Sequence, residues 1–179
     1  MADYEAIILG AGRAGIGLAV RLIAGDRDDL CILEQGEVPA DVADEVAARD
    51  LRSFIRVQAR AASAGWDARR QRWEIVIAGA QHLTCRCLVA AWGEAPALPE
   101  VTGLEGAAFA PGEAVALPGF PNLLLLSGPD ATARADAVLA AMALLDAPGA
   151  IEAVAPAGAA FDAEQFARIP VPEVKSIYG

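Results

Sequence analysis

The stretch that decides the fold is Tyr4-Glu-Ala-Ile-Ile-Leu-Gly-Ala-Gly-Arg-Ala-Gly15, which joins a short apolar run directly to three spaced glycines. Nearly unbroken apolar runs of this length fit a strand buried on both faces of a parallel sheet. Apolar residues then recur at helical spacing until Gly25-Asp26, and a second buried-type strand, Leu30-Cys-Ile-Leu-Glu34, ends in an acid. The stretch therefore predicts a β-α-β unit, the start of a Rossmann-like α/β fold with a parallel sheet.

The glycines form the G-x-G-x-x-G pattern of dinucleotide-binding sites, in its expected place between a strand and a helix. Gly10 permits a tight turn, Gly12 lets the backbone approach a diphosphate, and Gly15 lets the helix pack against the strand. Free N–H groups and the helix dipole favour an anion at this helix start, where Arg13 adds a cation. Glu34, about 20 residues further on, is placed to accept hydrogen bonds from ribose hydroxyls and to repel a 2′-phosphate. The alternative is a glycine-rich turn that only packs, but the complete set of strand, helix and acid favours an adenine dinucleotide.

The remainder of the chain predicts further elements of one dinucleotide-binding domain over residues 1–147, followed by a tail over 148–179. We expect a helix over 41–50, a strand over 54–58, and a helix ending near residue 145. Three short segments with turns between them (61–66, 73–78 and 82–86) predict an antiparallel meander, at about 60–87, inserted into the parallel sheet. Separate strands are expected over 88–92 and 122–127, joined by a loop-rich connection over 93–121. Within the tail we expect a short strand near residue 151 and a short helix over 162–167.

Composition excludes several function classes. A length of 179 residues suits one domain, and 14 Lys+Arg against 24 Asp+Glu, a net charge of -10, argues against nucleic-acid binding. No apolar run approaches the ~20 residues of a membrane span, and no basic segment precedes an apolar core at the N-terminus, so we expect a cytoplasmic protein.

The cysteines and the single histidine are expected to be structural. The three cysteines (Cys31, Cys85 and Cys87) lack conventional zinc spacing and sit in apolar runs, which favours buried reduced thiols over a redox or metal pair. Cys85 and Cys87 would share one face of a strand. His82 has no metal ligand at suitable spacing, so no metal site is expected.

Four segments resemble the flavin-containing and Baeyer–Villiger monooxygenases, which are flavoproteins with two dinucleotide-binding domains. The first segment is Ile7–Leu22 with Asp29–Glu34, and the second runs from Ile55–Arg56 through Ala64-Gly-Trp-Asp67 to Arg72-Trp73. The third is Leu88–Gly93 with Pro96, Leu98-Pro99 and Gly103-Leu104. The fourth is Gly119-Phe-Pro-Asn-Leu-Leu-Leu-Leu-Ser-Gly-Pro129. These segments cover roughly 100 residues between positions 4 and 145. The resemblance implies an FAD-binding domain.

The chain also departs from the pattern of that family. The family's Gly-Gly-x-Trp segment after the ribose acid is missing, and the connection over 93–121 holds no second G-x-G-x-x-G for NADPH. The F-x-G-x-x-x-H-x-x-x-W signature is absent because the sole histidine is His82. Trp92 replaces the usual Thr or Ser, and Asp130 stands where Asn is usual. These losses favour retained recognition of the ADP half and argue against independent monooxygenation, because a peroxyflavin must be kept from water.

The resemblance implies a site for FAD, or alternatively for NAD or another ADP-containing nucleotide, with no metal and no assigned catalytic residue. Its expected residues are Gly10, Gly12, Arg13, Ala14, Gly15, Glu34, Gln35, Arg60, Ala61, Ala91, Trp92, Gly93 and Asp130. Trp66, Trp73 and Trp92 are expected in the core, with Trp92 the best candidate for stacking on a flavin. Three hypotheses stay open: a minimal oxidoreductase-type flavoprotein, a non-catalytic nucleotide-binding or protein-interaction module, and a small NAD-dependent oxidoreductase. The missing domain favours a homodimer or a partner subunit over the face it would have covered.

Overall fold

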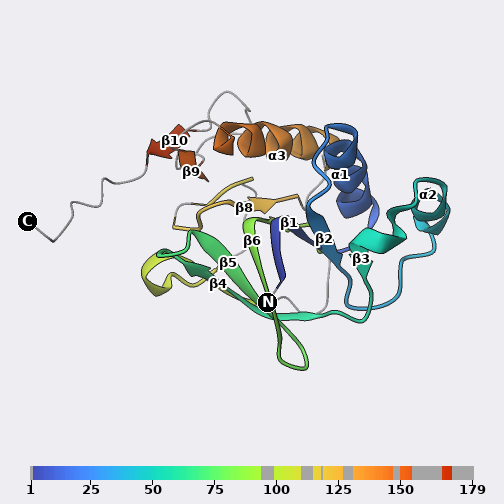
Figure 1. The fold of residues 1–179 in the computed structure, drawn as a ribbon, viewed down its shortest axis with the longest axis horizontal. Helices are drawn as coiled ribbons and strands as arrows, with labels where there is room; N and C mark the ends of the chain where they lie inside the picture. The colour runs from blue at the N-terminus through green and yellow to red at the C-terminus, as the bar shows by residue number, and fades with distance from the viewer. Residues whose placement is uncertain are drawn as a thin grey trace, which may run out of the picture.

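The computed structural model describes residues 2–93, 99–109, 115–117, 119–126, 131–146, 150–154 and 167–170. In this part of the chain a mixed sheet is covered on one face by helices α1 (Arg13–Ala24) and α3 (Ala131–Leu145), as Figure 1 shows. The parallel core of the sheet has the order β3-β2-β1-β6, and β8 also pairs with β6. Its strands are β1 (Ala2–Leu9), β2 (Leu30–Leu33), β3 (Ile55–Arg56), β6 (Gln81–Ala90) and β8 (Leu123–Leu125). The expected Rossmann-like α/β fold is confirmed.

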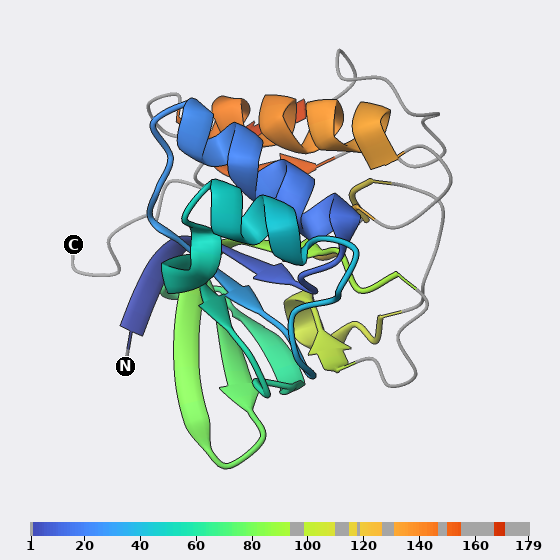
Figure 2. The same cartoon turned by 90° about the vertical axis from the view of Figure 1, so that its right-hand side faces the viewer.

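The meander consists of β4 (Ala61–Asp67), β5 (Arg72–Ile77) and the first half of β6. Strand β5 pairs antiparallel with both neighbours, and β7 (Glu100–Thr102) adds to the outer edge of β4 in parallel. The short helices α2 (Ala43–Ala48) and η1 (Leu51–Phe54) connect β2 to β3 (Figure 2). A hairpin of β9 (Ala150–Val154) and β10 (Ala167–Pro170) follows α3. The helix predicted over 162–167 lies outside the described residues except for Ala167, where β10 begins.

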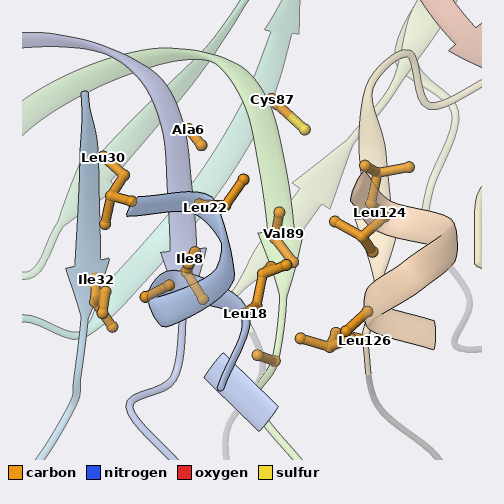
Figure 3. Packing of buried hydrophobic residues seen from close by; sticks show 14 of the residues in the cluster. Ala6, Ile8, Leu18, Leu22, Leu30, Ile32, Cys87, Val89, Leu124 and Leu126 are labelled. Atoms are coloured by element: carbon orange, nitrogen blue, oxygen red, sulfur yellow. The ribbon is translucent and has the colours of Figure 1, made fainter. Parts of the chain in front are cut away.

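Two hydrophobic clusters lie on opposite faces of the parallel strands. The helix-face cluster joins α1 and α3 to the sheet; Figure 3 shows Leu18 and Leu22 of α1 over Ile8, Ile32 and Val89. The meander-face cluster lies between the parallel strands and the meander and contains Ile7, Leu33, Trp73, Ile75 and Leu88. Burial on both faces explains why β1 and β2 read as continuous apolar runs.

Ion pairs tie α3 to the β-α-β unit. Arg21 of α1 pairs with Asp136 of α3, and Arg27, just after α1, pairs with Asp146 at the far end of α3. The first pair links the two helices directly, and the second links the turn after α1 to the residue that follows α3. No helix in the described part of the chain has the length and apolarity needed to cross a bilayer.

The strands predicted over 82–86 and 88–92 are one continuous strand, β6, so that division was wrong. No turn residue separates Arg86 from Leu88, and the strand instead changes partner: its first half pairs with β5 and its second half with β8. The three-residue strand β7 was missed because it is flanked by Pro99 and Gly103, which read as loop.

The prediction that Cys85 and Cys87 share a face is wrong as well. Cys85 packs in the meander-face cluster and Cys87 in the helix-face cluster, so the alternation of β6 shifts by one residue between them. At the same level of β1, the N–H groups of Glu5 and Ala6 both donate to the Asp29 carbonyl, at 3.0 and 3.2 Å. The β1–β6 pairing keeps its register here, from Tyr4↔Cys85 to Ala6↔Cys87, so both strands change the face of their side chains together.

Candidate nucleotide-binding site

The candidate site lies where β1, β2 and β6 end side by side at one edge of the sheet. Strand β1 leads into the glycine turn (Gly10–Gly12), β2 leads to Glu34, and β6 leads to Ala91, Trp92 and Gly93. Ligands of open α/β sheets bind at the carboxyl ends of the strands. Residues 91–93 and 10–12, far apart in sequence, are joined here because the Ala91 N–H donates to the Leu9 carbonyl at 2.9 Å.

Each glycine of the turn meets a different steric demand. Gly10 has φ +110°, and a Cβ there would lie 2.5 Å from the carbonyl oxygen of Ala91. At Gly15 a Cβ would lie 2.0 Å from the Gly10 carbonyl oxygen, which is how closely α1 approaches the turn. A Cβ at Gly12 would meet no atom within 4 Å, so the space beside this residue is open. Gly10 and Gly15 are therefore required by the fold, whereas the fold itself would accept a side chain at Gly12.

The first turn of α1 presents backbone N–H groups toward the glycine turn, with no side-chain cap from Gly12. Gly12 is its N-cap with extended backbone (φ −73°, ψ −178°), provides no side-chain cap, and the first turn holds no acidic residue. The first N–H groups of a helix, here those of Arg13 and Ala14 among them, have no acceptor within the helix and carry the positive end of its dipole. This arrangement can bind an anion.

Glu34 connects the two strand ends through hydrogen bonds to the backbone. One carboxylate oxygen accepts from the Ala11 N–H at 2.9 Å, and the other accepts from the Gly36 N–H at 3.0 Å. A carboxylate has about four acceptor positions, so about two are left for hydroxyl donors. The Ala59 N–H donates to the Glu34 carbonyl at 2.8 Å, which brings the segment before β4 to the same edge. We call Leu30–Gly36 the Glu34 flank of the site.

The opposite border is aromatic. The Trp92 ring is half-buried and contacts Phe109 edge to face, with 5.8 Å between ring centroids, and Phe109 contacts Phe120 in the same way at 5.9 Å. Gly93, at φ +56°, is exposed beside Trp92. We call Ala91–Gly93 together with Phe109 and Phe120 the Trp92 flank.

Other predicted site residues take positions that the sequence did not specify. The Arg13 side chain is exposed and donates through Nε to Asp41 at 2.8 Å, a contact that raises the pKa of its guanidinium above the ordinary value. Gln35 and Arg60 are exposed, whereas Ala61 is buried at the start of β4. Asp130 lies outside the described residues.

The remaining tryptophans and the thiols belong to the core. Trp73 is fully buried and its indole N–H donates to the Pro121 carbonyl at 2.7 Å, while Trp66 packs on Trp73 at 5.7 Å. All three cysteines are buried and reduced, as expected. Burial raises the pKa of the Cys87 thiol to about 12 and that of Cys85 well above its usual value. Among the described residues, no group of three or more His, Cys, Asp or Glu side chains could hold a metal ion.

Sequence reasoning did not identify three contributors to this site: Ala11, Gly36 and Phe109. The first two act through backbone N–H groups, which leave no side-chain signal in the sequence. Phe109 lies in the loop-rich connection, where the positions of the Gly and Pro residues do not indicate which side chain returns to the sheet.

No protein-family model matches the chain, and no curated protein matches its sequence. Among solved structures, the chain is similar to the closed form of cyclohexanone monooxygenase, at 16% identity and a TM-score of 0.51 over 65% of this chain and 32% of the other. It is also similar to oxidized steroid monooxygenase bound to NADP, at 21% identity and a TM-score of 0.47 over 58% of this chain and 30% of the other. A third similar structure is OTEMO complexed with FAD and NADP, at 19% identity and a TM-score of 0.47 over 57% of this chain and 28% of the other.

The chain thus matches about a third of the length of these structures. At such identity the similarity to cyclohexanone monooxygenase concerns the fold. The resemblance to flavin-dependent monooxygenases that the sequence indicates is confirmed at that level: this chain has the fold of one part of cyclohexanone monooxygenase.

Proposed function

We propose that this protein binds an adenine dinucleotide, FAD, with the diphosphate at the glycine turn and the adenosine ribose at Glu34. The observation that carries the proposal is the 2.9 Å hydrogen bond from the Ala11 N–H to the Glu34 carboxylate. It joins the acid and the turn through a contact within the chain itself. Preorganisation of this kind lowers the cost of ordering a binding site when the ligand arrives.

The residues present fit such a ligand. The open space at Gly12 admits a diphosphate against the backbone, and the donors at the start of α1 match its charge. The acceptor positions left on Glu34 match the two hydroxyls of a ribose, and the negative charge of Glu34 disfavours a 2′-phosphate. Bound FAD would supply redox chemistry, while the chain itself provides binding and orientation. We assign no catalytic residue.

The choice of FAD over NAD rests on the resemblance of the sequence to flavin-dependent monooxygenases and on the antiparallel meander that extends the sheet beyond β6. A second candidate function is nucleotide binding without turnover. The observation favouring it is the connection over 93–121, which holds no second glycine fingerprint for a nicotinamide cofactor. In that case we propose that a second copy of the chain or a partner subunit covers the face that a nicotinamide-binding domain would have covered.

Titration calorimetry with FAD, ADP, NAD⁺ and NADP⁺ tests the proposal. We expect binding of FAD and ADP, and weaker binding of NADP⁺ than of NAD⁺. Gly12→Ala places a methyl group in the open space and should weaken FAD and ADP binding by roughly 100-fold, because the diphosphate is held away from the backbone donors.

Gly17→Ala is the matched control for Gly12→Ala. Position 17 lies in the same helix and is also open, since a Cβ there meets nothing within 4 Å. This variant should bind FAD with an affinity within about twofold of the unmodified chain. Absence of heat with every adenine nucleotide, or equal affinity in Gly12→Ala, would show the proposal to be wrong. NADPH-dependent oxygen consumption by the purified protein would favour an enzyme over the binding module.

A further inference from the structure

We propose that Trp92 recognises the second half of the dinucleotide by contacting the isoalloxazine ring of FAD. This inference rests on the proposed function, because it takes the position of the diphosphate as given. It adds that the Trp92 flank makes the protein prefer FAD to ADP.

The order of the strands fixes the direction in which a dinucleotide must run. In the sheet, β2 and β6 lie on opposite sides of β1. Glu34 follows β2 and the glycine turn follows β1, so a ligand with its ribose at Glu34 and its diphosphate at the turn extends toward the end of β6. Neighbouring strands are about 4.8 Å apart, so this step from β1 to β6 is short compared with the length of a dinucleotide.

Trp92 is the aromatic residue at that end of β6, and it touches the turn. Its Cα lies 3.2 Å from the position that a Cβ on Gly10 would occupy. Phe109 contacts the indole edge to face and thereby restrains its orientation. The ring is half-buried, so part of it remains available to a ligand. A restrained, partly exposed indole is suited to contact a planar aromatic ring.

Trp66 offers a matched comparison within the same protein. It is also half-buried, and it also contacts one aromatic ring, that of Trp73. Its place is different, because Trp73 pairs with Cys85, five residues before the end of β6 at Ala90. Both tryptophans pack against the meander-face cluster, but Trp66 lies away from the strand ends, so its replacement should affect folding without affecting the choice of ligand.

The test measures dissociation constants for FAD, ADP and NAD⁺ with the unmodified chain, Trp92→Leu and Trp66→Leu. We expect Trp92→Leu to weaken FAD binding about tenfold while ADP binding changes less than about twofold. Trp66→Leu should leave the ratio of the two affinities unchanged. Trp92→Phe, which keeps a ring against Phe109, should recover part of the FAD affinity and serves if the leucine variant does not fold.

Tryptophan emission gives a second readout. FAD should quench the emission of the Trp66→Phe protein more than ADP does, and the difference should become smaller when Trp92 is also replaced by Phe, because only Trp73 then remains to transfer energy to the flavin. The inference is overturned if Trp92→Leu changes FAD and ADP affinity equally, if Trp66→Leu has the same effect, or if NAD⁺ affinity falls while FAD affinity does not. If the unmodified chain binds neither FAD nor ADP, the proposed function itself fails, which is a separate result.

Discussion

The Glu34 flank and the Trp92 flank border the same glycine turn, yet they are stabilised in different ways. On the Glu34 side, a continuous stretch of chain from β1 through α1 to β2 forms hydrogen bonds between a carboxylate and backbone N–H groups. On the Trp92 side, three aromatic rings from the end of β6 and from the loop-rich connection pack edge to face. Hydrogen bonds to a carboxylate require defined geometry, whereas aromatic packing depends on the arrangement of the whole sheet. The comparison indicates that hydrogen bonds within the β-α-β unit form the adenosine side and that packing of aromatic side chains forms the ring side.

The largest effect should come from the tight contact inside the β-α-β unit. In Gly15→Ala the new methyl group would lie 2.0 Å from the Gly10 carbonyl oxygen, so helix or turn must move. We expect the free energy of unfolding to fall by about 3 kcal/mol, the upper range for overpacking. Urea denaturation measures it. Gly17→Ala, in open space on the same helix, should instead raise the free energy of unfolding by about 0.5–1 kcal/mol. Equal effects of the two variants would contradict the tight contact.

The next prediction compares β6 and β2, the strands that lead to the two flanks, through the loss of folding stability at alkaline pH. The pKa of Cys87 in β6 is raised to about 12 from an ordinary value of 9.0 because the thiol is buried. Between these values the unfolded chain loses the proton and the folded chain keeps it, so stability present below pH 9 is lost as pH rises. This thiol should lower the free energy of unfolding by about 1.4 kcal/mol per pH unit over that window.

Cys87→Ala should reduce by that amount the slope with which the free energy of unfolding falls as pH rises, as measured by urea denaturation between pH 8 and 10. Cys31→Ala in β2 is the comparison, because the pKa of Cys31 is raised by burial but lowered in part by Arg56. Cys31→Ala should change the pH dependence of the free energy of unfolding over a narrower range of pH than Cys87→Ala does. An unchanged slope in Cys87→Ala would show that the folded state does not hold this thiol neutral.

The smallest effect tests the carboxylate of the Glu34 flank. In Glu34→Gln one acceptor oxygen is replaced by a donor, so either Ala11 or Gly36 loses its partner. We expect the free energy of unfolding to fall by about 1 kcal/mol. Glu37→Gln is the matched control, an exposed carboxylate on the same loop that accepts from the Gln58 side chain at 3.1 Å. It should change stability by less than about 0.5 kcal/mol, and a larger loss there than in Glu34→Gln would contradict the assignment.

The sequence predicted β1, α1 and β2 well because their signals are local. Apolar runs, glycine spacing and a terminal acid act over neighbouring residues, and the elements begin and end close to the expected positions. The same reasoning divided β6 in two and placed Cys85 and Cys87 on one face. Those errors share a physical cause, because the face that a side chain occupies and the change of partner strand are decided by the neighbouring strands and leave no pattern in β6 itself.

The amino-acid sequence by itself determined the β-α-β unit, the glycine turn and the place of Glu34, because each follows from backbone sterics and hydrophobic periodicity over a short stretch. Only the tertiary structure decided that Glu34 bonds to Ala11, that Arg13 turns to Asp41, and that Phe109 supports Trp92. These contacts join residues distant in sequence. They form only when the sheet brings the strand ends to one edge, since neither side chain alone specifies its partner.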